Sequence, residues 1–255
     1  MAIVVAIGGV LSWADAAQAR TVVVAGDSWA EGMAPLIAES FHRRGHTDMR
    51  IVNAGIGGTT AGQWAGWSDR VPGLMREYDD VRFVVLSLGA NDLVGNLTSL
   101  QADARMPRIE KDLRRVVEAI VAQDADVTIS LNGYDYMNLV DFPQCGYVSL
   151  PASMKASLNR RINEAMEDLA AIVRRLDDDY PQVRAAPFLG VMQKAAGQDP
   201  DSRRPSPTRF MDDCIHPNTE GYRLLAEHIY RRHFAADMGD TDEAVSDARS
   251  CCGCS

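Results

Sequence analysis

The residues best suited to do chemistry are a serine and a histidine that lie far apart in the chain. Ser28 ends the sequence VVVAGDS (22–28), in which a β-branched apolar run leads directly into Gly, Asp and Ser. A serine there can be an ordinary turn residue, or a nucleophile at the carboxyl edge of a parallel sheet. Because serine is a weak nucleophile, the second interpretation requires a base and a site that stabilises an oxyanion.

The sequence DCIHP (213–217) supplies a candidate base. Asp213 precedes His216 by three residues, just before an expected helix that Asn218 can cap. An aspartate in this position can accept the Nδ1–H of the histidine, which leaves Nε2 free to take a proton. The alternative is a capped helix start with an incidental histidine.

Two segments offer hydrogen-bond donors for an oxyanion. NAGIGGTTAG (53–62) and LSLGANDL (86–93) each follow an expected strand. A glycine in the first segment allows a backbone N–H to approach a ligand closely, and the second segment offers the Asn91 amide. The glycines do not match a phosphate cradle, because the third glycine of a dinucleotide fingerprint would fall on Thr60 and no lysine follows.

These segments lie between elements that predict an α/β fold. Apolar, β-branched runs are expected to form strands at 21–25, 50–54, 82–88, 126–131 and 183–188. Strands that are apolar on both faces are typical of a parallel sheet covered on both sides. With helical stretches between them, they predict a three-layer α/β/α sandwich, flavodoxin-like, with a five-stranded mostly parallel sheet. The long irregular segments 132–152 and 190–213 are expected at its carboxyl edge.

Four short segments together resemble one family, the SGNH hydrolases or GDSL-type lipases and esterases. They are GDS (26–28), NAGIGG (53–58), GAND (89–92) and DCIHP (213–217), in the order in which that family carries them. The resemblance spans about residues 21–235, and the four segments in order are far more specific than any one alone.

The resemblance implies a role for each matching residue. Ser28 is the implied nucleophile, His216 the base and Asp213 the residue that orients the histidine. The N–H groups of Ser28 and Gly58 and the side chain of Asn91 are the implied oxyanion hole. The family uses no metal and no cofactor, and the sequence contains no cluster with metal-ligand spacing.

The expected function is therefore a serine carboxylic-ester hydrolase that forms an acyl-enzyme on small esters, with short acyl chains or acetylated saccharides. Trp29, which stands where many members have Leu, is expected near the nucleophile and is a candidate substrate contact. Tyr134 and Tyr136 are candidate substrate contacts, although aromatic residues also fill cores. An acyltransferase, a thioesterase or lysophospholipase, and a catalytically silent carbohydrate-binding module are the alternatives.

The ends of the chain differ from its centre in composition. Residues 1–19 contain an apolar run too short to span a membrane, followed by Ala-Gln-Ala. This pattern predicts a signal peptide and a periplasmic or secreted protein, although no Lys or Arg precedes the run. A buried first strand is the alternative. The hydrolase domain is expected over 20–236, followed by an acidic, disordered tail (237–255) with a cysteine cluster.

Composition also limits the partners of this chain. Its 255 residues carry a formal net charge of −9 and no basic stripe, which argues against a nucleic-acid partner. The expected partner is a small-molecule or saccharide ester, without stable membrane insertion once the signal is removed. Cys145 and Cys214 lie in loops expected near the site and predict a disulfide; the oligomeric state is not predicted.

Overall fold

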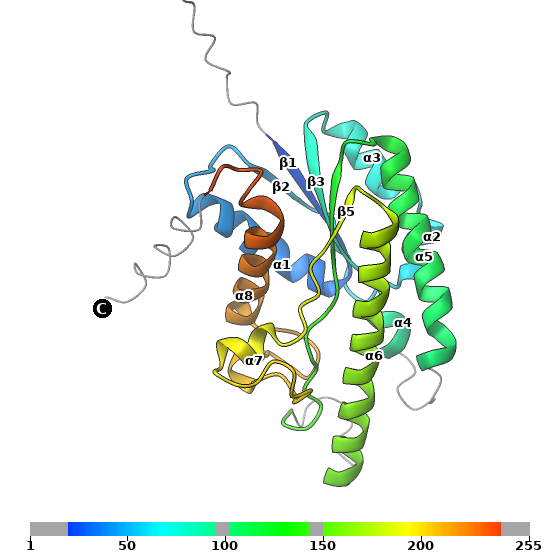
Figure 1. Ribbon diagram of the computed structural model, residues 1–255, viewed down its shortest axis with the longest axis vertical. Coiled ribbons are helices and arrows are strands. Elements are labelled where there is room, and N and C mark those ends of the chain that lie inside the picture. Colours follow the sequence, from blue (N-terminus) through cyan, green and yellow to red (C-terminus); the bar gives the residue numbers. More distant parts are fainter. Residues whose placement is uncertain (1–19, 95–101, 143–149, 241–255) are drawn as a thin grey trace, which may run out of the picture.

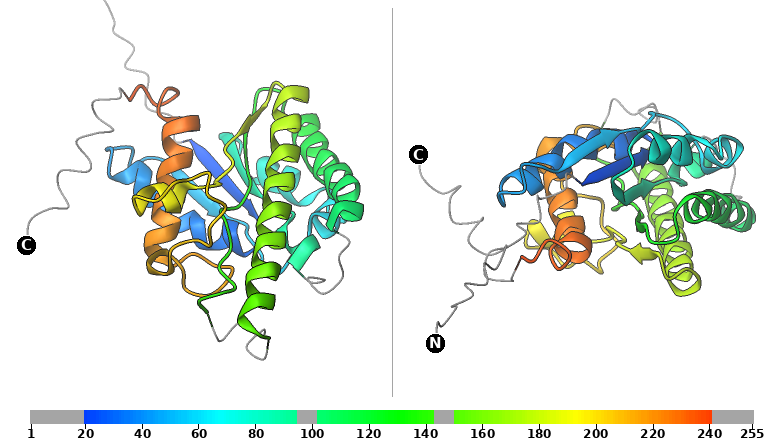
Figure 2. Two further views of the ribbon diagram at one scale, coloured as in Figure 1. Left: turned by 60° about the horizontal axis from the view of Figure 1, so that its bottom comes forward. Right: turned by 90° about the horizontal axis from the view of Figure 1, so that it is seen from above.

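The computed structural model describes residues 20–94, 102–142 and 150–240. These residues form a five-stranded sheet in the order β2-β1-β3-β4-β5, with every neighbouring pair parallel. The strands are β1 (Thr21–Gly26), β2 (Arg50–Asn53), β3 (Val81–Ser87), β4 (Thr128–Asn132) and β5 (Val183–Ala185). Helices lie on both faces of the sheet, which confirms the predicted three-layer, flavodoxin-like sandwich (Figures 1 and 2).

Right-handed crossovers decide which helices cover which face. The step from β1 to β2 runs in one direction across the sheet, and all later steps run in the other. Helices α1 and α8 therefore share one face, and α3, α5 and α6 cover the other (Figure 1). The helices are α1 (Ser28–His42), α2 (Ala61–Gly66), α3 (Arg70–Glu77), α4 (Ala90–Val94), α5 (Ala102–Gln123), α6 (Ala152–Asp179), α7 (Val191–Ala195) and α8 (Thr219–Ile229).

The sheet places several loops at one edge. Strand β1 is buried along its whole length, because it lies between β2 and β3 and is covered on both faces. The chain leaves β1 toward β2 but leaves β3 toward β4, so the strand order reverses between β1 and β3. In open α/β sheets such a switch point opens a crevice at the carboxyl ends of the strands.

Two predicted boundaries differ from the structure. The apolar run 183–188 predicts a longer strand, but β5 ends at Ala185 because Pro187 has no N–H to donate to a neighbouring strand. The folded part also extends past the predicted domain end at 236. Asp237 pairs with Arg184 at 2.7 Å, and the packed chain continues to residue 240. Residues 1–19, Cys145 and the rest of the predicted tail lie outside the described residues.

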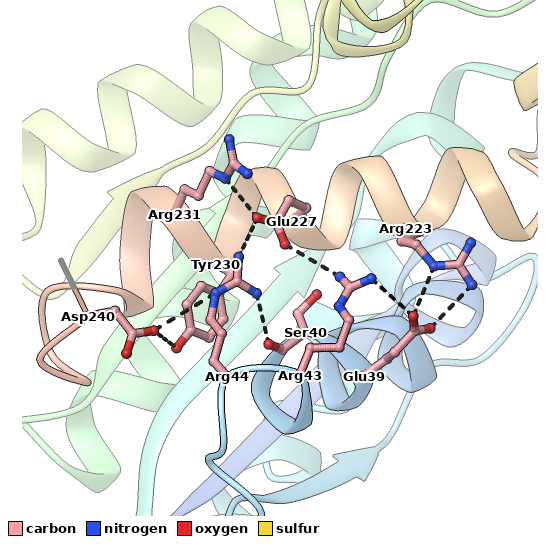
Figure 3. A network of polar contacts seen from close by, with 9 residues as sticks. All are labelled: Glu39, Ser40, Arg43, Arg44, Arg223, Glu227, Tyr230, Arg231 and Asp240. Carbon is pink, nitrogen blue, oxygen red and sulfur yellow. Dashed lines mark hydrogen bonds and ion pairs between the residues drawn. The ribbon is translucent and has the colours of Figure 1, made fainter. Parts of the chain in front are cut away.

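Helices α1 and α8 are joined by a network of ion pairs (Figure 3). Arg223 of α8 donates from Nε to Glu39 of α1 at 3.0 Å. Glu227 of α8 accepts hydrogen bonds from Arg44, which follows α1, and from Arg231. Burial would raise the pKa of Glu227, but these two arginines outweigh it and hold the pKa below its ordinary value. The network thus fixes the two helices to each other.

No helix within the described ranges is both long enough and apolar enough to cross a membrane.

Candidate active site

The turn from β1 into α1 positions Ser28. Gly26 has a φ of +138°, and a Cβ there would lie 2.0 Å from the carbonyl oxygen of Ser87, so only glycine fits. Asp27 caps α1, because its Oδ1 accepts the N–H of Trp29 at 3.0 Å. Ser28 is therefore the first residue of α1, at the carboxyl edge of the sheet, and its side chain is partly exposed.

His216 lies beside Ser28 and is oriented by Asp213. The Nε2 atom of His216 is 2.9 Å from Oγ of Ser28, and its Nδ1 is 2.8 Å from Oδ2 of Asp213. The other carboxylate oxygen of Asp213 accepts the N–H groups of Ile215 and His216. Burial would raise the pKa of Asp213, but the bonds from His216 and the backbone outweigh it and lower the pKa. An ionised Asp213 favours a proton on Nδ1 and a lone pair on Nε2.

Trp29 connects the turn that carries Ser28 to the loop that carries His216. Its indole N–H donates to the carbonyl of Ile215 at 2.9 Å, and its ring packs edge-on against Tyr134 and Tyr222. The side chain is only 2% exposed. Trp29 is adjacent to Ser28 in the chain, but its side chain is buried and engaged with the His216 loop, so it does not offer the substrate contact expected from the sequence.

The three predicted oxyanion donors come from three separate segments: the start of α1, the glycine loop after β2, and α4. The N–H of Ser28 is at the first position of α1, where a helix leaves its amide without an internal acceptor. Gly58 has a φ of +75°, and a Cβ on its neighbour Gly57 would lie 3.8 Å from Cβ of Ser28. Asn91 of α4 donates from Nδ2 to the carbonyl of Thr59 at 2.9 Å. The glycine loop and α4 thus meet beside the serine.

A buried carboxyl group lies behind these donors. Oδ2 of Asp27 accepts the hydroxyl of Tyr134 at 2.5 Å and lies 3.3 Å from Nδ2 of Asn91. Asp27 is 1% exposed, and burial raises its pKa to about 7 despite the hydrogen bonds from Tyr134 and Trp29. Asp27 therefore links the first turn of α1, the Asn91 amide and Tyr134 through one group.

The two tyrosines predicted as substrate contacts are both buried. Tyr134 is 0% exposed, and its hydroxyl is used by Asp27. Tyr136 is 4% exposed and donates to Glu167 of α6 at 3.0 Å. Asp135, between them, accepts the N–H groups of Gly190 and Met192, so this irregular segment is held inside the molecule. The structure assigns these tyrosines to internal contacts, a correction to the sequence-based expectation.

Two further features bear on the site. Cys214, between Asp213 and His216, is part of a disulfide. Its partner lies outside the described residues, as does Cys145, so the pairing of the two stays a prediction. In the described ranges, no group of three or more His, Cys, Asp or Glu side chains could hold a metal ion.

A serine at a strand-to-helix turn, beside a histidine that an aspartate orients, thus lies at the carboxyl edge of the sheet. The family of the chain is shown by a family model. Residues 19–224 match the GDSL-like lipase/acylhydrolase family. The chain belongs to this family and is a carboxylic-ester hydrolase. No curated protein matches the chain by sequence.

Solved structures of esterases share the fold. A catalytic mutant of Axe2, an acetylxylan esterase from Geobacillus stearothermophilus, has a TM-score of 0.56 and 15% identity, with 84% of this chain and 93% of that chain covered. The acetyl xylan esterase AlAXEase has a TM-score of 0.51 and 21% identity, with 84% and 100% covered. The esterase EstA from Pseudoalteromonas sp. has a TM-score of 0.50 and 18% identity, with 87% and 100% covered.

Proposed function

We propose that this protein hydrolyses small esters through an acyl-enzyme on Ser28. The observation that carries the proposal is the continuous chain of contacts from Oγ of Ser28 to His216 and on to Asp213, at 2.9 and 2.8 Å. Both distances are within hydrogen-bond range, and the acid, the base and the nucleophile are in the order that serine hydrolysis requires.

In the first step Oγ of Ser28 attacks the ester carbonyl carbon while Nε2 of His216 takes the hydroxyl proton. The negative charge on the carbonyl oxygen is stabilised by the N–H groups of Ser28 and Gly58 and by the Asn91 amide, which exchanges its 3.3 Å contact with Asp27 for the oxyanion. The carbon–oxygen bond to the alcohol then breaks, and the histidine returns its proton to the leaving oxygen. Water repeats the sequence on the acyl-enzyme and releases the acid.

The orientation of His216 depends on Asp213. Because the carboxylate accepts the Nδ1–H, the lone pair of Nε2 faces Ser28, and the imidazolium formed during attack is stabilised by the adjacent negative charge. The serine is at a helix N-terminus, where unpaired N–H groups and the helix dipole both favour a developing negative charge.

We propose small esters as substrates, either short acyl esters or acetyl groups on saccharides. Two of the structures similar to this chain are named as acetylxylan esterases, which supports the second class. The described residues carry no large exposed apolar lid beside Ser28: the exposed large hydrophobic residues among them are Trp67, Val140 and Met154. Long-chain lipids would require more apolar surface.

Hydrolysis of p-nitrophenyl acetate, butyrate and octanoate tests the proposal. We expect turnover that decreases from acetate to octanoate and is lost in Ser28→Ala. Ser68→Ala, a change at an exposed serine of the same protein, is the matched control and should leave the rate unchanged. An equal rate in Ser28→Ala and wild type would contradict the proposal. Products formed with an added sugar acceptor would separate hydrolysis from acyl transfer.

We also propose that the chain is exported to the periplasm or the medium. The disulfide at Cys214 supports this, because disulfides persist mainly in oxidising compartments. The apolar segment before Ala19 is the proposed signal. Fusion of residues 1–25 to a reporter that is active only after export tests the idea; a reporter that stays inactive would contradict it.

A further inference from the structure

A cavity of about 590 Å³ opens beside the predicted oxyanion donors. Three elements surround it: the start of α2, helix α4 and the first turns of α5. Its main polar lining residues are Thr60, Gln63, Asn91, Asp92, Arg105 and Arg108. Because Asn91 belongs both to this cavity and to the proposed oxyanion hole, a group bound in the cavity would lie next to the reacting carbonyl.

Two arginines give the cavity a positive side. Arg105 and Arg108 are three residues apart on α5, so their side chains lie on one face of the helix. Arg105 donates from Nη1 to the carbonyl of Asp92 at 2.7 Å, which holds its planar guanidinium at the cavity. The side chain of Arg108 is 84% exposed, and its Nε is 3.7 Å from Oδ2 of Asp112, beyond normal hydrogen-bond length.

Asp92, the acidic residue in the cavity lining, already accepts hydrogen bonds from the backbone. Oδ2 of Asp92 accepts the N–H of Ala61 at 2.8 Å, and Gly62 supplies a second backbone donor. Burial is the main reason that the pKa of Asp92 is raised, so its negative charge is disfavoured there. Among the described residues, the cavity lining therefore holds two arginines and one carboxyl group, Asp92, which backbone N–H groups already engage. The carboxylate of Asp112, outside the lining, pairs with Arg108 at 3.7 Å.

We propose that this cavity binds an anionic group of the ester substrate, a carboxylate or a phosphate, through Arg105 and Arg108. Guanidinium groups bind such planar or tetrahedral anions through paired, charge-assisted hydrogen bonds. The inference rests on the proposed ester hydrolysis at Ser28, because it makes the anion part of the molecule whose carbonyl lies at Asn91. It adds a preferred substrate class, esters that carry a negative charge.

Matched ester pairs test this preference and locate the charge. The first pair, p-nitrophenyl hemisuccinate and p-nitrophenyl butyrate, differs by a charge on the acyl part. The second pair, 4-acetoxybenzoate and 4-acetoxybenzamide, differs by a charge on the alcohol part. For each pair, the ratio of kcat/KM for the anionic member to that for the neutral member is compared between wild type and variants, which cancels the intrinsic reactivity of the esters.

The variants remove charge but keep hydrogen-bonding capacity. We expect Arg108→Gln to lower the ratio of one pair about fivefold, and the Arg105→Gln/Arg108→Gln double variant to lower it about tenfold or more. Arg115→Gln is the matched control: this arginine is exposed on the same helix, about 10 Å further along, and should leave both ratios unchanged. Unchanged ratios for both pairs in the double variant would overturn the proposal.

A binding measurement separates this proposal from the proposed hydrolysis. The Ser28→Ala protein is titrated with monomethyl succinate, and the Nε–Hε NMR signals of Arg105 and Arg108 are followed, with dimethyl succinate as the neutral probe. If none of the four esters is turned over, hydrolysis at Ser28 fails but the cavity is still tested. Shifts of both signals with the monoanion alone would then support anion binding, and the absence of shifts would overturn it.

Discussion

The hydroxyl of Ser28 and the imidazole of His216 lie 2.9 Å apart, although 188 positions separate them in the chain. Two contacts outside this pair hold it in place. Trp29, next to Ser28, donates to the carbonyl next to His216. Helix α1, which begins at Ser28, also packs against α8, which follows His216. The geometry of the site therefore depends on how the two ends of the domain meet.

Loss of Asp213 should impair turnover without loss of the fold. Asp213→Asn would place an amide against Nδ1 of His216, which favours the wrong tautomer and removes the charge that stabilises the imidazolium. We expect kcat to fall by roughly 10³–10⁴-fold. Steady-state kinetics with p-nitrophenyl acetate measures this, and circular dichroism checks the fold.

The matched control for that experiment is Asp212→Asn, which changes the neighbouring acidic residue. Asp212 is exposed and does not contact His216 through its side chain among the described contacts. A fall in kcat for Asp212→Asn as large as that for Asp213→Asn would contradict the assignment of Asp213.

Tyr134 should act as a positioning residue for the oxyanion donors. Burial raises the pKa of Asp27, and the hydrogen bond from Tyr134 opposes that rise. Removing the hydroxyl in Tyr134→Phe should therefore raise the pKa of Asp27 further. We expect a lower kcat, a nearly unchanged KM and an acid limb of the pH–rate profile that moves to higher pH.

Tyr136→Phe is the matched control. It also removes the hydroxyl of a buried tyrosine, but that hydroxyl donates to Glu167 and not to Asp27. Both variants should lose about 1 kcal/mol of stability. Only Tyr134→Phe should change the pH–rate profile. Identical profiles in the two variants would show that Tyr134 has only a structural role.

The ion pairs between α1 and α8 should contribute to stability. The side chain of Arg44 is 3% exposed, and Glu227 is its closest acidic partner. Glu227→Gln replaces the carboxylate beside the buried Arg44 guanidinium with a neutral amide. We therefore expect a loss of about 3 kcal/mol in the free energy of unfolding. Urea unfolding followed by tryptophan fluorescence measures it.

Glu39 provides the comparison within the same network (Figure 3). It pairs with Arg43 and Arg223 but is 36% exposed, so Glu39→Gln should cost less than about 1 kcal/mol. An equal loss in the two variants would show that burial of Arg44 does not set the size of the effect.

Stability should also depend on pH through His233. Burial is the main reason that its pKa falls to about 4, and it lies between Ser130 Oγ and the carbonyl of Ala185. Below pH 6.5 the unfolded chain binds a proton that folded His233 does not, so stability is lost as pH falls from about 6.5 to about 4. The pKa shift corresponds to about 3 kcal/mol.

Urea unfolding of wild type and His233→Asn between pH 4 and pH 7 isolates this contribution. Asparagine can accept the Ser130 hydroxyl but does not titrate, so the stability advantage of wild type should shrink as pH falls. A constant difference between the two proteins across this range would contradict the prediction.

Much of the fold could be predicted from the sequence because its strands are apolar on both faces, a pattern that a buried parallel sheet requires. Four of the five predicted strands end within one or two residues of the observed ones. The exception is β5: the apolar composition of 183–188 favours a longer strand, but Pro187 ends it. The packing of residues 237–240 is not visible in the local sequence, because their partners, such as Arg184, lie far away in the chain.

By itself, the sequence determined the order of the elements and which short segments follow the strands, since strand and turn preferences act between near neighbours. It also made the pairing of Asp213 with His216 predictable, because the two residues are only three positions apart. Only the tertiary structure decided what Tyr134 and Tyr136 do. An irregular segment with aromatic residues can be exposed or buried, and here Asp27, Glu167 and the backbone of α7 satisfy its polar groups inside the molecule. Burial and distant partners decide such roles, and neither is encoded in local spacing.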